Sequence, residues 1–299
     1  MTAPTTPLRA NDHHQANDIE EAERAHLAAV LGQVRAAVAR SGALAARTEE
    51  SHREAGAQLA ASRGELAPEE AHLSAFELNR LDAQAAAAAR SHRRLEKLLA
   101  SPYFARVDFL DGDDAAARGA GADPDASAGP DAGGTVSAGG APEVTYIGRF
   151  AFTWENKAVV SDWRSPVAAL FYDFEPGPAA FQAPAGERRG TLVRKRQVAV
   201  EEGRLVYAVD SSSSVRDEVL AQALSRSSDA KMHDIVASIQ REQNAVIRDE
   251  APGTLVIQGV AGSGKTSIAL HRVAYLLYRQ KERLSSQSVA ILSPSRVFS

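Results

Sequence analysis

The sequence contains no cysteine among its 299 residues, which excludes disulfide bonds, thiolate catalysis and cysteine-ligated zinc or iron–sulfur centres. It also has no apolar run approaching the roughly 20 residues of a membrane-spanning helix. The polar N-terminal residues contain no apolar core of a signal peptide. The formal net charge is −4, so no overall positive field attracts nucleic acid, and any basic contact surface has to be local. We therefore expect a cytoplasmic protein without a membrane segment.

Near the C-terminal end, one stretch fits the phosphate-loop pattern G-x-x-x-x-G-K-[ST]. It consists of Gly259, Val260, Ala261, Gly262, Ser263, Gly264, Lys265 and Thr266, followed by Ser267. Residues 254–258 are predicted to form a short buried strand before the loop, and residues 267–278 a helix after it. Residues 288–292 are predicted to form a second apolar strand. Glycines allow backbone N–H groups to converge on phosphate oxygens, and the helix N-terminus adds its positive dipole end. The pattern therefore predicts a site for ATP and Mg²⁺.

Two residues of this loop carry the predicted chemistry. We expect Lys265 to reach the β- and γ-phosphates of ATP and Thr266 to hold Mg²⁺, which makes them the candidate catalytic residues. Residues 259–264 and Ser267 are expected to contact the cofactor through the backbone and the first helical turn. The alternative is a glycine-rich turn between a strand and a helix that binds nothing.

The first third of the chain is rich in alanine and predicts two long helices. In the first, Leu27, Leu31, Val34 and Val38 recur at alternating spacings of four and three, which is typical of a coiled-coil seam. The second helix, predicted over residues 68–100, is about 50 Å long at ~1.5 Å per residue. The residues expected to face the first helix are Leu73, Phe76, Leu81, Ala85, Ala88, Leu95 and Leu99.

Such an antiparallel hairpin has two interpretations. It is either a helical module packed on the rest of the protein, or an arm that projects toward a partner. The acidic residues near its turn, Glu65, Glu69 and Glu70, either address a basic channel or metal ion or simply favour the helix dipole.

The central part of the sequence changes to β patterning. The predicted strands are 144–153, 158–163, 168–174, 191–200 and 205–209, with a hairpin turn at Glu202-Gly203. Residues 111–143 contain no aromatic side chain and are expected to form a disordered insertion.

Two polar features of this part each have two interpretations. The corner 162–166 (DWRSP) is either a binding point or an Asp–Arg pair beside a tryptophan that fixes a turn. The basic group either meets nucleic acid or an acidic protein, or forms a solvated face; its members are Arg188, Arg189, Arg194, Lys195 and Arg196.

We therefore expect the following organisation, an α+β part followed by an α/β part. The ranges are a disordered tail (1–17), a coiled-coil hairpin (18–100), a β-rich module (101–210), a linker with a short helix (211–228) and a nucleotide-binding part (229–299).

Several of these segments together resemble the HelD/HelR-type ATPases, superfamily 1 helicase-like motors of the UvrD/Rep group that bind bacterial RNA polymerase. The carriers of the resemblance are GVAGSGKTSIALHRVAYLLY (259–278), IQREQNAVIR (239–248), SPYFARVDF, YIGRF and SDWRSP. The resemblance implies that Gln243 reads the adenine edge, because an amide can donate and accept together, and that Arg248 belongs to the same cofactor site. It also implies that residues 229–299 begin a RecA-like domain.

The same resemblance implies a function. Family members insert the hairpin, here 18–100, into the secondary channel of the polymerase and use ATP to release and recycle stalled enzyme. Nucleic acid is met through later parts of the motor. This sequence contains only the start of the first of two RecA-like domains, so it is expected to be a fragment that hydrolyses ATP poorly by itself. The alternatives are a UvrD/Rep-type 3′–5′ helicase acting directly on DNA and a polymerase-binding module that works without ATP.

Overall fold

The computed structural model describes residues 10–62, 67–112, 141–211, 239, 241–260 and 262–292; for 10–17 and 68 it describes the backbone alone. The chain divides into two compact units. Unit 1 comprises Met1–Arg106, Tyr146–Ser161 and Arg196–Asp229. Unit 2 comprises Val107–Thr145, Asp162–Lys195 and Ala230–Ser299. Most of the insertion predicted at 111–143, and the linker predicted at 211–228, lie outside the described residues.

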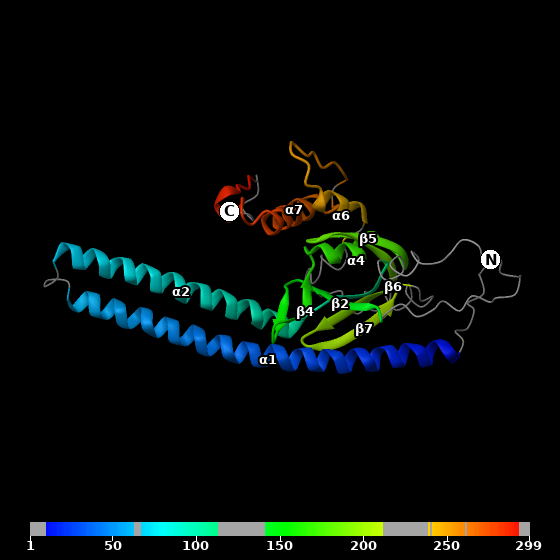
Figure 1. Ribbon diagram of the computed structural model, residues 1–299, viewed down its shortest axis with the longest axis horizontal. Helices are drawn as coiled ribbons and strands as arrows, with labels where there is room; N and C mark the ends of the chain where they lie inside the picture. The colour runs from blue at the N-terminus through cyan, green and yellow to red at the C-terminus, as the bar shows by residue number, and fades with distance from the viewer. Residues whose placement is uncertain are drawn as a thin grey trace, which may run out of the picture. The chain divides into compact units, whose positions relative to one another are not determined.

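Two long helices dominate unit 1 (Figure 1). They are α1 (Ala10–Ala61) and α2 (Pro68–Ala100), and Pro68 occupies the first turn, where its missing N–H costs no hydrogen bond. Helix α1 begins at Ala10, inside the segment predicted to be a disordered tail, so that prediction is wrong for residues 10–17.

The two helices form the predicted antiparallel hairpin. The Ser41 hydroxyl lies 2.9 Å from His92 Nδ1, and His52 lies 3.9 Å from Asp82, closer to the connecting turn. Contacting residues thus approach each other in sequence toward the turn, as antiparallel helices require. The half-buried positions of α1 recur at alternating spacings of three and four, at 41, 45, 48, 52, 55 and 59.

In the described part of the chain, seven strands form one sheet with the order β3-β4-β2-β1-β6-β5, and β7 also pairs with β6. Their bounds are β1 Ala105–Asp111, β2 Glu143–Gly148, β3 Phe152–Trp154, β4 Lys157–Asp162, β5 Gly177–Ala183, β6 Gly186–Glu201 and β7 Arg204–Asp210. Strand β3 pairs with β4, β5 with β6 and β6 with β7, each in the antiparallel direction. The α+β character of the predicted fold is therefore confirmed for this part of the chain.

The hairpin turns follow local backbone chemistry. Glu202 and Gly203 both have positive φ, 49° and 73°, as a two-residue turn between twisted strands requires, so this predicted turn is confirmed. Glu155 and Asn156, with φ of 47° and 64°, make the corresponding turn between β3 and β4. The strand predicted over 144–153 is accordingly divided into β2 and β3.

One predicted strand is a helix. Of the predicted strand 168–174, residues 168–173 lie in the 3-10 helix η1 (Pro166–Ala168) and the short helix α4 (Ala169–Asp173). Consecutive residues Leu170, Phe171 and Tyr172 are buried, so the apolar run has no periodicity that separates a buried strand from a buried helical turn.

The core of unit 1 joins α1 to the strands. Leu27, Leu31 and Val34 are all buried, but they pack against strand residues as well as the end of α2. Their partners in this core include Leu98, Tyr103, Tyr146, Phe152, Val160, Val198 and Val200. These residues are therefore buried, but they face a mixed core of strand and helix residues, and the coiled-coil packing of this seam stays a prediction.

A buried ion triad lies in the same core. Arg196 on β6 donates from Nη1 to Glu23 Oε2 at 3.0 Å, and from Nε to Asp210 Oδ1 at 2.6 Å. The side chains of Arg196 and Glu23 are 3% and 0% exposed. The triad connects α1 to the β6–β7 hairpin, and Glu23 and Arg196 are 173 residues apart in the sequence.

His26, one turn after Glu23, makes the stability of unit 1 sensitive to pH. Its ring stacks on Tyr146 at 3.9 Å, and burial lowers the pKa of His26; Glu23 opposes this shift and Arg106 adds to it. Below about pH 6.5 the unfolded chain binds a proton at His26 that the folded chain does not bind, so the unfolding free energy falls as pH falls.

We expect urea unfolding at pH 7.5 and 5.5 to show this loss, at most about 1.4 kcal/mol per pH unit from this group. His26→Phe keeps the stacked ring and removes the proton, so its stability should fall less than that of the wild type. Equal pH dependence of the two proteins would contradict the assignment.

Unit 2 has a core of its own. Phe109 on β1 and Phe181 on β5 meet edge to face at 5.6 Å, and Val107, Leu170 and Leu192 are 0–1% exposed. Two further helices belong to this unit, α6 (Arg241–Arg248) and α7 (Lys265–Arg279), and the 3-10 helix η3 (Ser286–Ser288) follows. Across the described part of the chain, no helix is long and apolar enough to cross a bilayer.

Candidate functional site

Helix α7 begins at the end of the glycine-rich loop. Gly264 is its N-cap, with φ of 77°, a left-handed conformation that glycine adopts without a Cβ clash. The first helical hydrogen bond runs from Ile268 N to Gly264 O at 2.9 Å, and no described side chain caps this end of the helix. The first-turn N–H groups of α7 therefore form the kind of helix terminus that attracts anions.

Lys265, the first residue of α7, places its charge inside the loop. Its Nζ donates to the carbonyl oxygens of Gly259 at 2.9 Å and Val260 at 2.7 Å. The loop is closed further by a hydrogen bond from Ser263 N to Val260 O at 3.3 Å. A Cβ on Gly259 would lie 2.6 Å from Ser263 Oγ, so a larger residue at this position would require the Ser263 hydroxyl to rotate away. The loop thus combines a cation with backbone groups, a chemistry that fits a phosphate.

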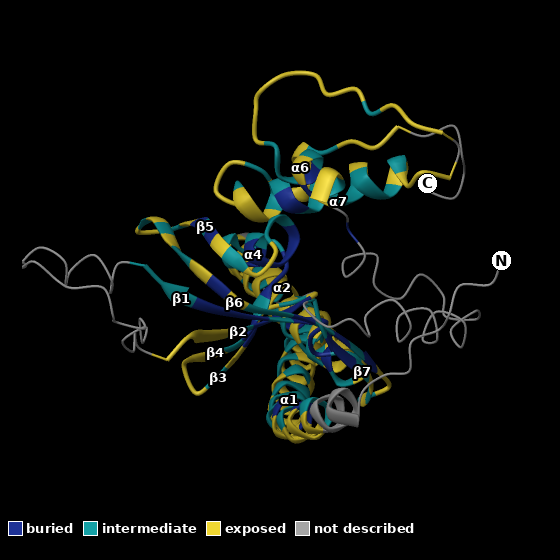
Figure 2. Ribbon diagram, turned by 90° about the vertical axis from the view of Figure 1, so that its right-hand side faces the viewer, coloured by how far each residue is buried: buried dark blue, intermediate teal, exposed yellow. Residues whose placement is uncertain are grey.

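The segment before the loop is not the predicted buried strand. Residues 254–258 have no regular secondary structure, and Val256 is 74% exposed (Figure 2). The strand predicted at 288–292 is also absent, because Ser288 ends the 3-10 helix η3, residues 289–292 have no regular secondary structure, and Leu292 is 96% exposed. A strand exists through hydrogen bonds to neighbouring strands, and no described strand pairs with either segment.

Helix α7 is joined to the segment around α6 by polar contacts. Arg272 donates to Val246 O at 2.6 Å, and both Tyr275 Oη and Arg279 Nε donate to Glu250 Oε1 at 3.0 Å. Burial raises the pKa of Tyr275, which keeps its hydroxyl protonated as the donor in this contact. The two helices are therefore held as a pair.

Gln243 and Arg248, the two predicted cofactor residues outside the loop, both lie on α6, and Gln243 is half-buried. The Arg248 guanidinium donates to Trp163 O at 2.7 Å and to Ser165 O at 3.3 Å. In this arrangement it binds protein carbonyls. Contact of Gln243 and Arg248 with a nucleotide stays a prediction.

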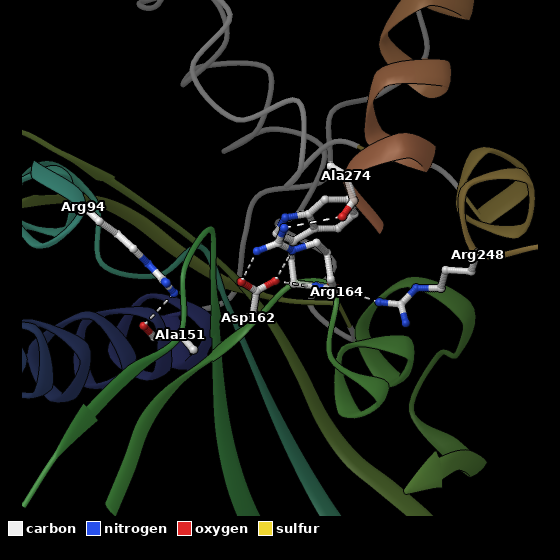
Figure 3. Close-up of polar contacts among 7 residues, drawn as sticks. Arg94, Ala151, Asp162, Arg164, Arg248 and Ala274 are labelled. Atoms are coloured by element: carbon white, nitrogen blue, oxygen red, sulfur yellow. Dashed lines mark hydrogen bonds and ion pairs between the residues drawn. The ribbon is translucent and has the colours of Figure 1, made fainter. Parts of the chain in front are cut away.

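The corner 162–166 is fixed by the predicted Asp–Arg pair. Arg164 donates from Nε and Nη2 to the two carboxylate oxygens of Asp162, at 2.8 and 2.7 Å. Asp162 is 2% exposed, and Arg164 also reaches Ala274 O on α7 at 3.5 Å (Figure 3). The structural interpretation of the corner is thus confirmed, and its contact with α7 is an addition that the sequence did not indicate.

The comparisons place the chain among known proteins. The family model described as the N-terminal domain of DNA helicase IV HelD matches residues 20–223, which is more than half of the chain. The chain belongs to the HelD family. A comparison with curated proteins gave no match. The HelD match covers the hairpin and the strands, while the phosphate loop at 259–266 lies C-terminal to the matched range.

In this HelD-family chain the predicted basic group is neutralised locally. Arg188 pairs with Asp111 and Glu143, and Arg194 pairs with Asp108. Arg189 pairs with Glu187, Lys195 with Glu175, and Arg196 with Glu23 and Asp210. All five therefore make ion pairs within the protein. Arg196 is also buried, so it is not part of a solvated face.

The contacts that sequence reasoning missed join distant segments of unit 2. Asn244 Nδ2 donates to Asp173 Oδ1 at 2.7 Å, and the rings of Trp163 and His271 meet edge to face at 5.5 Å. No local pattern indicates such pairs, because their members are 71 or more residues apart. Among the described residues, no group of three or more His, Asp and Glu side chains forms a metal site.

Proposed function

We propose that this HelD-family chain is the ATP-binding N-terminal part of a superfamily 1 helicase-like motor. The motor binds bacterial RNA polymerase and uses ATP to release and recycle stalled polymerase. The observation that carries the proposal is the HelD N-terminal match together with a phosphate-loop sequence whose Lys265 ammonium lies against the loop carbonyls at the start of a helix. The HelD match identifies the family, and the loop with Lys265 provides the groups that could bind phosphate.

In this proposal each part of the loop has a defined role. Backbone N–H groups of residues 259–264 and the first turn of α7 bind phosphate oxygens, and Lys265 reaches the β- and γ-phosphates. Thr266 holds Mg²⁺, which neutralises charge on the phosphates, and Gln243 reads adenine. Thr266 is exposed, which is consistent with access to a ligand.

The proposed RecA-like character of residues 229–299 accounts for the exposed apolar segments. Val256 and Leu292 belong to runs with the composition of buried parallel strands, yet they are 74% and 96% exposed. We propose that 254–258 and 288–292 become strands when further strands of a RecA-like sheet pair with them.

Exposed apolar and acidic side chains on the hairpin support the proposal that it binds a protein partner. Leu73 and Phe76, three residues apart on α2, are 69% and 66% exposed. Glu69 and Glu70 are exposed on the preceding turn. Together these side chains fit a partner surface that has apolar pockets beside basic groups, and they lie near the turn of the hairpin.

The test is retention of purified bacterial RNA polymerase by the immobilised full chain. We expect retention by the wild type and an affinity lowered at least about tenfold by Leu73→Ser combined with Phe76→Ser, because central apolar anchors dominate interface energies. Leu44→Ser is the matched control, since Leu44 is also exposed on the hairpin, at 57%.

Absence of polymerase retention by the wild type would contradict the proposal. Salt-dependent binding of single-stranded DNA in the absence of polymerase would favour the alternative of a helicase acting directly on DNA.

A further inference from the structure

The segment that follows β4 holds α6 from one side. Arg248 on α6 donates to two carbonyls of this segment, Trp163 O and Ser165 O. Asn244, which is 0% exposed, donates to Asp173 Oδ1 at 2.7 Å. The Arg248 guanidinium also lies over the ring of Tyr172, at 5.7 Å from its centroid. These contacts attach α6 to residues 162–173 by groups that are partly or fully withdrawn from water.

The same segment holds α7, the helix that carries the phosphate loop. Arg164 donates to Ala274 O, and its guanidinium lies 4.7 Å from the ring centroid of Tyr278. Because both carboxylate oxygens of Asp162 accept hydrogen bonds from the Nε–Nη2 edge of this guanidinium, Arg164 has little freedom to follow α7 if the helix shifts.

A third contact lies closer to the loop. The Trp163 ring meets His271, whose Nδ1 is 2.7 Å from Ser267 O in the first turn of α7. His271 is six residues after Lys265, so it lies about 9 Å along the helix from the proposed phosphate site. Trp163 therefore contacts α7 through His271, and His271 in turn contacts the first turn of the helix through Ser267 O.

We propose that Trp163 and Arg164 are positioning residues for nucleotide binding: the corner 162–166 clamps α7 so that its N-terminus and Lys265 keep the orientation that the phosphate requires. This inference rests on the proposed function of the loop. It assigns to the DWRSP corner a role in tuning nucleotide affinity without contact with the nucleotide. It also makes the environment of Trp163 dependent on whether the loop holds a ligand.

The first test is titration of the full chain with N-methylanthraniloyl-ATP and Mg²⁺. Arg164→Ala is expected to raise the dissociation constant about 5- to 30-fold, because it removes a charge-assisted hydrogen bond and a cation–π contact. Arg189→Ala is the matched control, because Arg189 lies in the same unit with its side chain 77% exposed and is expected to bind as the wild type does.

The second test measures the fluorescence of Trp163, which should not respond to ATP if the corner has only a structural role. The chain has two tryptophans, so Trp154→Phe leaves Trp163 as the reporter. We expect unlabelled ATP with Mg²⁺ to change Trp163 emission in a saturable manner, and Lys265→Ala to abolish the change. An emission that does not respond while the wild type binds the analogue, together with unchanged affinity in Arg164→Ala, would overturn the inference.

Failure of the proposed function gives a different result. If the wild type does not bind the analogue, the nucleotide role of both the loop and the corner is overturned. Hydrogen exchange then decides whether the clamp exists at all. Faster exchange of the α7 amides 268–274 in Arg164→Ala than in Arg189→Ala supports it, and equal exchange overturns it.

Discussion

Arg196→Ala is expected to lower the free energy of unfolding by about 3–5 kcal/mol, because it leaves two carboxylates buried without their counter-ion. Glu23 and Asp210 both accept hydrogen bonds from this guanidinium, and their side chains are 0% and 17% exposed. Water that could replace the guanidinium has little access to Glu23. The measurement is urea unfolding of the full chain at neutral pH.

Two controls separate the effect of burying an unpaired charge on the free energy of unfolding from the effect of removing any arginine. Arg189→Ala removes an arginine from an exposed ion pair with Glu187, and we expect a loss of about 0–1 kcal/mol. Replacing the whole triad with apolar residues (Glu23→Leu, Arg196→Met, Asp210→Leu) should recover most of the loss, since no unpaired charge remains. A loss below about 1 kcal/mol in Arg196→Ala would show that the triad is solvated.

Lys265→Ala is expected to weaken binding of a fluorescent ATP analogue with Mg²⁺ by about 10- to 150-fold, the range for loss of a hydrogen bond to a charged group. The lysine ammonium lies 2.9 and 2.7 Å from two carbonyls of the loop, so its charge is already inside the site. The measurement is fluorescence anisotropy at fixed salt, with unlabelled ATP as competitor.

Lys281→Ala is the control for lost positive charge, since Lys281 is exposed just beyond the end of α7. Its affinity for the analogue should match that of the wild type. Equal affinities of Lys265→Ala and wild type would place nucleotide binding elsewhere or nowhere, and the proposed role of the loop would be rejected.

The hairpin shows why a helix is easier to predict from sequence than the set of its residues that face the partner helix. Leu73 and Phe76 were expected to face α1 because they are the most apolar residues in that part of α2, but both are exposed. The face toward α1 contains polar members such as His92, which is half-buried and lies 2.9 Å from the Ser41 hydroxyl. The spacing of apolar residues in one sequence indicates that a helix has one buried face. The packing against the partner helix determines which residues lie on that face.

The loop and its flanks show a second limit. Residues 259–266 were located from the sequence because glycine, lysine and threonine at fixed spacing carry their chemistry locally, and helix α7 follows the loop where it was predicted. The flanking segments 254–258 and 288–292 were predicted as strands and are not, because pairing is a property of neighbours. Residues 168–173 were predicted as part of a strand and are helical, because a short buried apolar run fits either element.

The sequence by itself determined the features that depend on neighbours along the chain: the antiparallel hairpin, the Glu202-Gly203 turn, the Asp162–Arg164 pair and membership of the HelD family. Only the tertiary structure decided which long-range partners these residues meet. It placed Arg196 in a buried triad with Glu23, 173 residues away, and Arg164 against Ala274, 110 residues away. Local propensity carries no information about contacts at such separations, because they form only when the core brings distant segments together.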